Sequence, residues 1–288
     1  MKIIKYFFEF ISIISLFCIF KIIGLKNASG LGSILGKIVG PLFRSKNITK
    51  QNIRTGLGNL DKKNEKEIIN NMWSNIGRTF AEYVFLKDFK FNKTNFDHMK
   101  IIGTDYLNEI KRSNKPVIFY SGHFANFELM AMELDKFGIK TAAIYRPLNN
   151  FFLNPLMEYL RMKYICPTQI PKGRMGMREI INRIKDGYSI ALMMDQRVSE
   201  GQKVPFFNKP AFTTTIPAQL ALKYNCKLVP IFLERKGRIN FEMTVHEPYE
   251  IERTGNDEED TKKITLKINQ IIEKMIIKNP TQWIWSHN

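Results

Sequence analysis

The sequence predicts an α/β protein with a mainly parallel central sheet flanked by helices, preceded by an N-terminal hydrophobic membrane-anchoring helix. Two observations lead to this prediction. From about residue 99 onward, short apolar runs typical of buried strands alternate with segments whose apolar residues recur at helical spacing. The first 24 residues, in contrast, are nearly all apolar. Strands joined by helices of this length favour a parallel sheet covered on both faces.

The N-terminal apolar run extends from Ile3 to Gly24. A bilayer span needs about 20 predominantly apolar residues, and this run reaches that length only with Lys5, Glu9 and Lys21 near its ends. Because no small-x-small cleavage site follows, we expect a retained anchor rather than a cleaved signal peptide. Lysines at both ends leave its orientation undecided.

A second N-terminal stretch, residues 28–43, places Gly32, Gly36 and Gly40 four residues apart. In a helix these glycines form a smooth stripe that another helix or the bilayer surface can approach closely. A flexible glycine-containing linker is the alternative. The predicted organisation is therefore a membrane-associated region at 1–60 and one catalytic domain at 61–288.

The elements of the catalytic domain follow from apolar spacing and from glycine stops. We predict helices at residues 63–86, 106–112, after His123 as far as Lys136, 152–162, 173–185, 215–224 and 260–278. We predict strands at 99–102, 116–120, 141–145, 164–170, 189–194, 227–233 and 240–247. Pro230 makes the strand at 227–233 an edge or bulged strand, since proline cannot donate to a ladder.

Composition narrows the class of function. The 288 residues can form one large domain with an N-terminal accessory, and 44% hydrophobic residues exclude disorder. A net charge of +17 favours anionic partners such as lipid headgroups, phosphorylated sugars or an acidic carrier protein. No nucleic-acid-binding motif accompanies this charge. The cysteines form no CxxC pair, no histidines have metal-ligand spacing, and no nucleotide-binding signature occurs, so we expect no metal and no bound cofactor.

The most informative motif is Tyr120-Ser-Gly-His-Phe-Ala-Asn-Phe-Glu128, directly behind the strand at 116–120. Five helical steps of about 100° would leave His123 and Glu128 roughly 140° apart. The two can meet if Gly122 turns the chain, His123 precedes the helix and Glu128 projects from its first turns. An imidazole held by a carboxylate is a good base for a hydroxyl proton, although a histidine beside a strand can also be structural.

Further polar residues fall where strands of the sheet should end. Arg146 follows one strand, and Asp195-Gln-Arg197 follows another. Lys172 and Arg174 flank a glycine at a helix start, an arrangement suited to phosphate, and Arg161 lies late in the preceding helix. Each arginine alone can be a surface or capping residue; together they predict a basic pocket for an anionic substrate. The apolar segments 204–207 and 211–215 fit an acyl-chain channel or core packing equally well.

Several ordered motifs resemble those of the bacterial lipid A late acyltransferases, the lauroyl- and myristoyltransferase relatives within the lysophospholipid acyltransferase-like superfamily. The resemblance covers nearly the whole chain and rests on Gly122 to Glu128, Tyr145-Arg-Pro147 with Asn149-Asn150, Asp195-Gln-Arg197, Val204-Pro-Phe-Phe207, Ala211 to Thr215, and Gln282-Trp-Ile-Trp-Ser-His287. The family often has glycine and tryptophan where this chain has Ala125 and Phe127.

The resemblance implies transfer of a fatty acyl group from acyl carrier protein to a hydroxyl of a lipid A precursor, an anionic glycolipid. The place implied is the cytoplasmic face of the bacterial inner membrane. His123 would be the general base, Glu128 its orienting carboxylate, and Asp195 an acidic residue near the site. Arg161 would position the reacting groups or stabilise developing charge. The residues that would meet phosphates are Arg146, Lys172, Arg174 and Arg197.

Two alternatives stay open from the sequence. The first is an acyltransferase of the same fold that acts on another glycolipid or an aminolipid, with acyl-CoA or acyl carrier protein as donor. The second is a non-catalytic, membrane-associated lipid-binding protein. The presence of both His123 and Glu128 argues against the second alternative.

Overall fold

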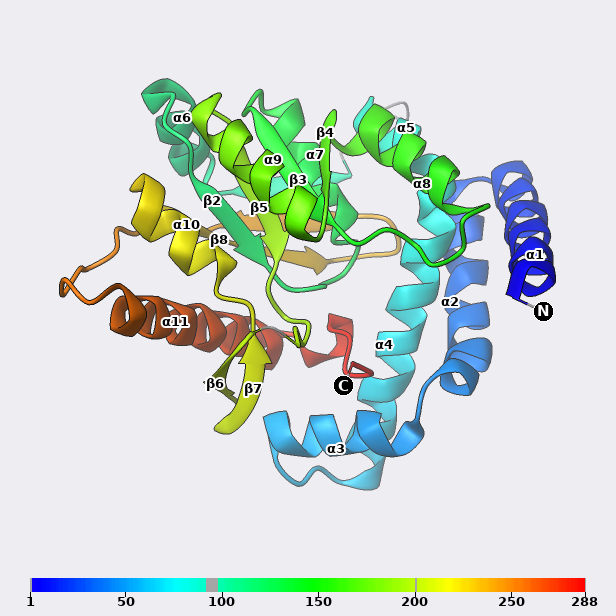
Figure 1. The fold of residues 1–288 in the computed structure, drawn as a ribbon. Helices are drawn as coiled ribbons and strands as arrows, with labels where there is room; N and C mark the ends of the chain where they lie inside the picture. The colour runs from blue at the N-terminus through cyan, green and yellow to red at the C-terminus, as the bar shows by residue number, and fades with distance from the viewer. Residues whose placement is uncertain (1, 92–97, 200, 288) are drawn as a thin grey trace.

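The computed structural model describes residues 2–91, 98–199 and 201–287. Its centre is a seven-stranded sheet in the order β1-β9-β8-β2-β5-β3-β4, and β6 and β7 form a separate antiparallel hairpin. Neighbouring strands are parallel except β8 and β9, which are antiparallel. Helices lie on both faces of the sheet (Figure 1), so the predicted α/β class with a mainly parallel sheet is confirmed.

The elements agree with most of the predicted ranges. The strands are β1 (Met99–Ile102), β2 (Ile118–Ser121), β3 (Thr141–Tyr145), β4 (Thr168–Pro171), β5 (Ser189–Met193), β6 (Gln202–Phe206), β7 (Lys209–Thr213), β8 (Leu228–Arg235) and β9 (Phe241–Val245). The helices are α1 (Lys2–Ile23), α2 (Leu25–Phe43), α3 (Lys46–Leu57), α4 (Lys62–Glu82), α5 (Leu86–Lys90), α6 (Thr104–Ser113), α7 (Glu128–Lys136), α8 (Asn154–Leu160), α9 (Arg174–Lys185), α10 (Ile216–Tyr224) and α11 (Asp257–Lys278).

Alternation along the strands divides the core between the two faces of the sheet. In β2, Phe119 packs into a cluster that includes α6 and α7, whereas Ile118 and Tyr120 pack into a cluster with α4, α9, α10 and α11. All three side chains are buried. A strand that is covered on both faces reads as a continuous apolar run, and this explains why the sequence revealed β2 so clearly.

The prediction that Pro230 makes this an edge or bulged strand is wrong, since both ladders of β8 pair residue for residue. β8 lies inside the sheet, between β2 and β9. Its first residues, up to Pro230, pair with β2, and its pairing with β9 begins at Ile231. Pro230 therefore stands where the strand acquires its second neighbour, and the β9 ladder does not need the N–H that proline lacks.

Two further predictions need correction. The strand expected at 164–170 begins only at Thr168, because residues Arg161–Ile165 form a turn of π-helix, η2, that continues α8. Residues 204–207 and 211–213 belong to the β6–β7 hairpin, and 214–215 follow it; no hairpin was predicted here. Its turn residues, Phe207 and Asn208, both have positive φ, a geometry typical of two-residue hairpin turns.

The glycine stripe of α2 packs against α4, so the linker alternative is wrong. A Cβ added at Gly32 would lie 2.4 Å from the carbonyl oxygen of Gly77 in α4, and one at Gly36 would lie 2.2 Å from that of Trp73. The two helices run side by side in Figure 1. The absence of side chains lets the backbones approach each other closely.

α1 lies beside α2 at one side of the molecule (Figure 1). Among the described residues it is the helix whose length and apolar composition would allow it to cross a bilayer. Phe17 and Phe20 are buried in the same cluster as strand residues of the sheet, while Ile3, Ile4, Phe8 and Ile22 are exposed. The helix is compatible with membrane association, and the boundary at residue 60 stays a prediction.

Candidate active site

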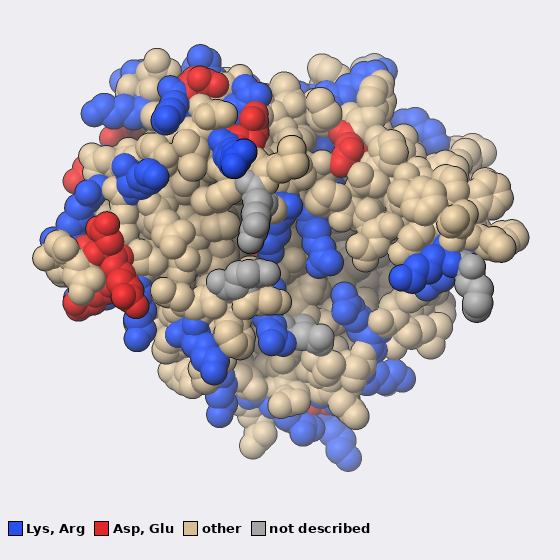
Figure 2. Space-filling model, viewed as in Figure 1, with Lys and Arg blue, Asp and Glu red and all other residues tan. Residues whose placement is uncertain are grey.

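A cavity of about 440 Å³ opens at the carboxyl ends of β2, β3 and β5. Figure 2 shows a hollow at the centre of this face with lysine and arginine side chains along its walls. His123, Glu128, Arg146, Arg161 and Lys172 all line the cavity. The structure thus brings five of the eight predicted site residues to one place.

His123 is held by Asp195. Its Nδ1 lies 2.7 Å from Asp195 Oδ1, and its backbone N–H donates to Asp195 Oδ2 at 2.7 Å. Trp283 Nε1 donates to the same Oδ2 at 2.7 Å. The Asp195 side chain is fully buried. Since Nδ1 faces the carboxylate, Nε2 is the nitrogen left for chemistry.

Burial and charge act against each other in this pair. Burial favours the neutral imidazole, but the Asp195 carboxylate outweighs it and raises the pKa of His123 above its usual value. Burial alone would raise the pKa of Asp195; His123 and its hydrogen bonds instead lower that pKa to about 2. Asp195 is therefore a carboxylate at neutral pH and stabilises a proton taken up by His123.

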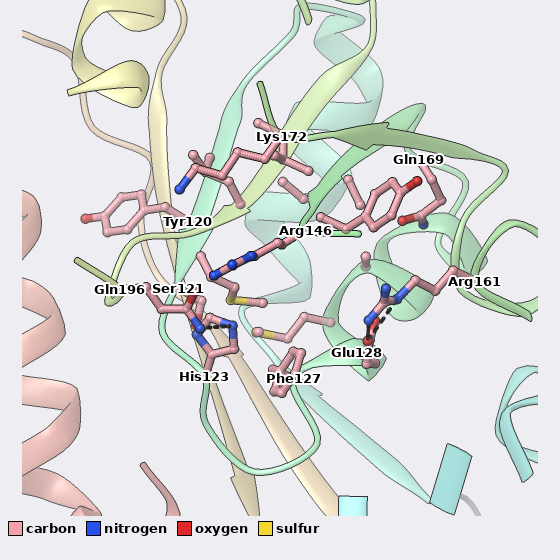
Figure 3. A pocket seen from close by; sticks show the side chains of 18 of the residues that line it. Tyr120, Ser121, His123, Phe127, Glu128, Arg146, Arg161, Gln169, Lys172 and Gln196 are labelled. Carbon is pink, nitrogen blue, oxygen red and sulfur yellow. Dashed lines mark hydrogen bonds and ion pairs between the residues drawn. The ribbon is translucent and has the colours of Figure 1, made fainter. Parts of the chain in front are cut away.

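The carboxylate that holds His123 is not the one we expected. In the described contacts Glu128 does not bind His123; its Oε1 accepts from Arg161 Nη2 at 2.6 Å, from Arg161 Nε at 3.1 Å and from Tyr83 OH at 2.9 Å. Figure 3 shows the ring of Phe127 between His123 and the Glu128–Arg161 pair. The cavity is therefore bordered by a His123–Asp195 hydrogen-bonded pair and a Glu128–Arg161 ion pair rather than by one His–Glu dyad.

Sheet register explains the pairing of His123 with Asp195. Ser121 and Met193 are partners at the ends of the parallel neighbours β2 and β5. His123 and Asp195 each follow two residues after these partners. The signal was present in the sequence as two polar residues behind two buried strands, but only the strand order shows that β2 and β5 are neighbours. Trp283, far along the chain, carried no such signal.

Glu128 turns away from His123 because of the loop between β2 and α7. Ala125, not Gly122, has the left-handed conformation, with φ 47°, and Glu128 then starts α7. From there its side chain meets Arg161 at the end of α8, whose guanidinium also lies 5.8 Å from the ring centre of Tyr83. The charge of Glu128 still contributes to raising the pKa of His123.

Buried hydrogen bonds hold this loop in place. The carbonyl oxygen of Ala125 accepts from Asn75 and Thr79 of α4, both at 3.0 Å. Asn126 Nδ2 donates to Glu82 at 3.0 Å. Glu82 is fully buried and forms a two-pronged ion pair with Arg235 of β8, at 2.6 and 3.0 Å. These residues lie far apart in the chain, so no local pattern in the sequence indicates that they form this support.

Gln196 and His287 complete the wall beside His123. Gln196 Nε2 lies 3.3 Å from His123 Nε2 and 3.4 Å from His287 Nε2. Burial lowers the pKa of His287 to about 4, so this second imidazole is neutral at pH 7. Asn52 of α3 holds the segment through hydrogen bonds to the carbonyl oxygens of Trp285 and His287, at 2.9 and 2.7 Å.

The predicted basic residues separate into groups. Arg146 and Lys172 reach toward the side of the cavity where His123 and Gln196 lie (Figure 3). Arg44, which the sequence analysis did not select, also lines the cavity. Arg197 lines a neighbouring cavity instead, with its guanidinium 5.3 Å from the ring centre of Phe212. The side chain of Arg174 lies outside the described part of the structure.

The inner part of the cavity is apolar. Its walls come from β3, α7, η2 and β5, through Met130, Leu134, Ala143, Ile165 and Met193. Of the described residues that line the cavity, Glu128 is the one acid. A basic mouth above an apolar interior suits a molecule with an anionic head and a hydrocarbon chain.

The described residues contain no group of three or more His, Cys, Asp or Glu side chains placed to hold a metal ion. Cys166 and Cys226 are buried and unpaired, and Cys18 is exposed. The arrangement at the cavity is that of a buried acid, an imidazole and an open space, which can remove a proton from a hydroxyl.

Several known proteins are similar to this chain in sequence. A lipid A biosynthesis acyltransferase of Haemophilus influenzae is 28% identical over 198 residues, which cover 65% of this chain and 59% of that protein. A lipid A biosynthesis lauroyltransferase of Escherichia coli is 25% identical over 193 residues, with coverage of 65% and 60%. A palmitoleoyltransferase of the same pathway and species is 25% identical over 269 residues, with coverage of 89% and 82%.

The first two matches thus span about three fifths of each relative's length. The model of the family described as bacterial lipid A biosynthesis acyltransferase matches residues 1–288. A match over that range, together with a basic and apolar cavity around an acid-held histidine, leads to one conclusion. This chain belongs to the bacterial lipid A biosynthesis acyltransferase family.

Proposed function

We propose that this protein transfers a fatty acyl group from the thioester of acyl carrier protein to a hydroxyl of a lipid A precursor. The observation that carries the proposal is the His123–Asp195 pair at the mouth of a cavity whose rim is basic and whose interior is apolar. The family membership supports the same reaction class.

In the proposed reaction, His123 Nε2 removes the proton of the acceptor hydroxyl as its oxygen attacks the thioester carbonyl. The C–O bond forms, and a tetrahedral oxyanion results. Its collapse breaks the C–S bond, and the proton on His123 passes to the leaving thiolate, so the products are an ester and a free thiol. Asp195 stabilises the imidazolium between these steps.

Arg161 is the proposed positioning and charge-stabilising residue. Its guanidinium lies at the cavity and is bound to Glu128, and its Nη1 is buried without a hydrogen-bond partner among the described atoms. A buried donor without a partner is costly, so a substrate oxygen placed there would gain a hydrogen bond. Glu128 keeps the guanidinium in position, a role that replaces the one first expected for it.

The two ends of the cavity suit the two parts of the substrates. We propose that Arg146 and Lys172 bind phosphate groups of the acceptor, since cations at the rim favour anionic groups. The acyl chain of the donor would lie among Met130, Leu134 and Ile165. The length of chain accepted would then depend on how deep these side chains allow it to enter.

Association with the cytoplasmic face of the inner membrane is part of the proposal. Exposed apolar side chains continue from α1 onto α2, where Ile34, Ile38, Leu42 and Phe43 face solvent. Monomeric soluble proteins seldom expose such large contiguous apolar surfaces. A bilayer would cover this surface and bring the cavity close to a lipid acceptor.

His123→Ala tests the catalytic proposal. We expect acyl transfer to fall by at least about 100-fold, the usual contribution of a general base, with the melting temperature preserved. His246→Ala, which replaces a histidine outside the cavity, is the matched control.

Mass spectrometry of glycolipids from cells with and without the gene identifies the acceptor. If the number of acyl chains on lipid A is unchanged and another lipid changes instead, lipid A is not the acceptor. If His123→Ala turns over as fast as the unchanged protein, His123 is not the general base.

A further inference from the structure

Three hollows on one face of the molecule are joined through shared lining residues. The active-site cavity and a second cavity of about 420 Å³ share Gln196 and His287. The second cavity and an open hollow beside α3 share Thr55 and Lys209. The second cavity therefore adjoins both the active-site cavity, at Gln196 and His287, and the hollow beside α3. Neither Arg146 nor Lys172, the residues of the basic rim, lines it.

The outer hollow is polar and cationic. It lies between α3 and the β6–β7 hairpin and is lined by Asn47, Lys50, Gln51, Arg54, Thr55 and Lys209. No acid lines it among the described residues. Lys50 and Arg54 share a single carboxylate, Glu65, at 3.1 and 3.3 Å, and their side chains remain 47% and 60% exposed. The surface therefore keeps an excess of positive charge that is available to a partner.

The second cavity has aromatic walls. Phe206, Phe207, Phe212, Trp283 and Trp285 line it, and Asn52 and Asn269 add amide groups. Walls of this kind suit a narrow, flexible arm that combines methylene and amide groups. At its inner end, the Gln196 amide lies against His123 Nε2, so a group that arrives there displaces this amide and meets the reactive nitrogen.

We propose that the hollow beside α3 is the docking surface for an acidic carrier protein, and that the arm bearing the acyl thioester reaches His123 through the second cavity. This inference rests on the proposed acyl transfer and adds separate entries for the two substrates. The donor enters from α3 and the hairpin, and the anionic acceptor enters at the rim formed by Arg146 and Lys172.

The character of α3 favours a protein partner over the bilayer. A helix that lies in a membrane surface turns an apolar face outward. The outward side chains of α3 are Lys46, Asn47, Lys50, Gln51, Arg54 and Thr55, and its apolar Ile53 is buried. The exposed apolar side chains of α2 end at Phe43, before α3 begins. Lysines and arginines are frequent along the lower edge of Figure 2, where α3 and the hairpin lie in Figure 1.

Direct binding tests the surface independently of turnover. The full chain in detergent is titrated with acylated acyl carrier protein, and affinity is followed by fluorescence anisotropy. For Lys50→Ala/Lys209→Ala we expect the dissociation constant to rise roughly tenfold, mostly at low salt, because rim charges steer and hold a charged partner. Arg54 still pairs with Glu65 in this variant, so we expect its melting temperature to match that of the unchanged protein.

The matched control is Lys115→Ala/Lys140→Ala, which removes two exposed lysines at the opposite edge of the sheet, ahead of β2 and β3. We expect this pair to change the affinity by less than about twofold. If both double variants lose carrier affinity to the same extent, the hollow beside α3 is not the docking surface. The same holds if the carrier affinity is unchanged and binding to vesicles that contain anionic phospholipid is weaker.

The arm is tested with carrier protein that lacks it. We expect the acylated carrier to bind more tightly than the same carrier without its prosthetic group, which is the arm. If the two affinities are equal, the arm does not bind in the second cavity. The catalytic proposal is tested by the turnover of His123→Ala, and this inference by the carrier affinity of variants outside the active-site cavity. A failure of the catalytic proposal therefore appears in turnover alone, and a failure of this inference appears in binding.

Discussion

At the scale of single residues, the state of His123 depends on Asp195. The imidazole is only 15% exposed, and this partial burial alone would favour the neutral form and lower its pKa. The carboxylate at 2.7 Å reverses that effect and fixes which ring nitrogen faces the cavity. Trp283 and the backbone N–H of His123 hold the carboxylate in turn, so the orientation of the base is set before any substrate binds.

Asp195→Asn tests this dependence. A base must be neutral to act, so transfer by the unchanged protein should fall as the pH drops through the pKa of His123, which lies above its usual value because of Asp195 despite partial burial. The amide removes the charge that raises this pKa, so we expect the acid limb of the pH–rate profile to move to lower pH. We also expect turnover to decrease by about 10²- to 10⁴-fold, since the imidazolium and its tautomer lose their support.

Asp257→Asn is the control for that profile, because Asp257 is exposed at the start of α11. Its profile should match that of the unchanged protein. An acid limb that stays in place in Asp195→Asn, measured as the pH dependence of kcat/KM, would contradict the role assigned to Asp195 and return Glu128 to consideration as the partner of His123.

At the scale of elements, the contact between α2 and α4 decides how the N-terminal region meets the sheet. Its glycines leave the two backbones closer than any side chain would allow. α4 in turn supplies Asn75, Thr79 and Glu82 to the loop that carries His123. Helix packing at the N-terminus is therefore connected to the active-site loop through one helix.

Gly36→Ala should destabilise the protein, and Gly30→Ala should not, although both glycines lie in α2. A Cβ at residue 36 would lie 2.2 Å from the carbonyl oxygen of Trp73, whereas one at residue 30 meets nothing within 4 Å. We expect a loss of about 1–3 kcal/mol in the free energy of unfolding for Gly36→Ala, from overpacking. Gly30→Ala should gain up to about 1 kcal/mol from helix propensity.

Thermal or denaturant unfolding in a mild detergent measures both variants. Similar free energies of unfolding for the two would mean that α2 and α4 do not pack as closely as the structure shows. A loss confined to Gly36→Ala would instead identify close backbone contact as the reason that this stripe consists of glycine.

At the scale of the whole molecule, the buried pair of Glu82 and Arg235 joins α4 to β8 beneath the active-site loop. Both side chains are almost completely buried. Ser29 of α2 donates to Glu82, and Asn126 of the loop does so as well. The pair is therefore a junction among the N-terminal helices, the sheet and the site.

Arg235→Leu should reduce the free energy of unfolding by about 3–5 kcal/mol, because the change leaves Glu82 buried without its counter-ion. Lys263→Ala is the control, since it breaks the exposed pair with Glu259 and should cost less than about 1 kcal/mol. Denaturant unfolding compares the two. If Arg235→Leu is as stable as the control, Glu82 is not the buried anion that the structure describes.

Much of the fold was predictable because buried strands and amphipathic helices leave periodic traces in the sequence. β2, β3 and β5 were found within a residue or two, and α2 was found through its glycines. The failures have local causes. Pro230 lies where β8 changes its pairing, and η2 continues a helix beyond its expected end. The β6–β7 hairpin has too short a pattern to stand out from apolar core.

The sequence by itself determined that a histidine, two carboxylates and several cations would gather behind the strands of a parallel sheet, since carboxyl ends of parallel strands share one edge. Only the tertiary structure decided which carboxylate meets which cation. Strand order makes β5 the neighbour of β2 and so brings Asp195 to His123. The left-handed turn at Ala125 directs Glu128 to Arg161, because hydrogen bonds form between neighbours in space, whatever their separation along the chain.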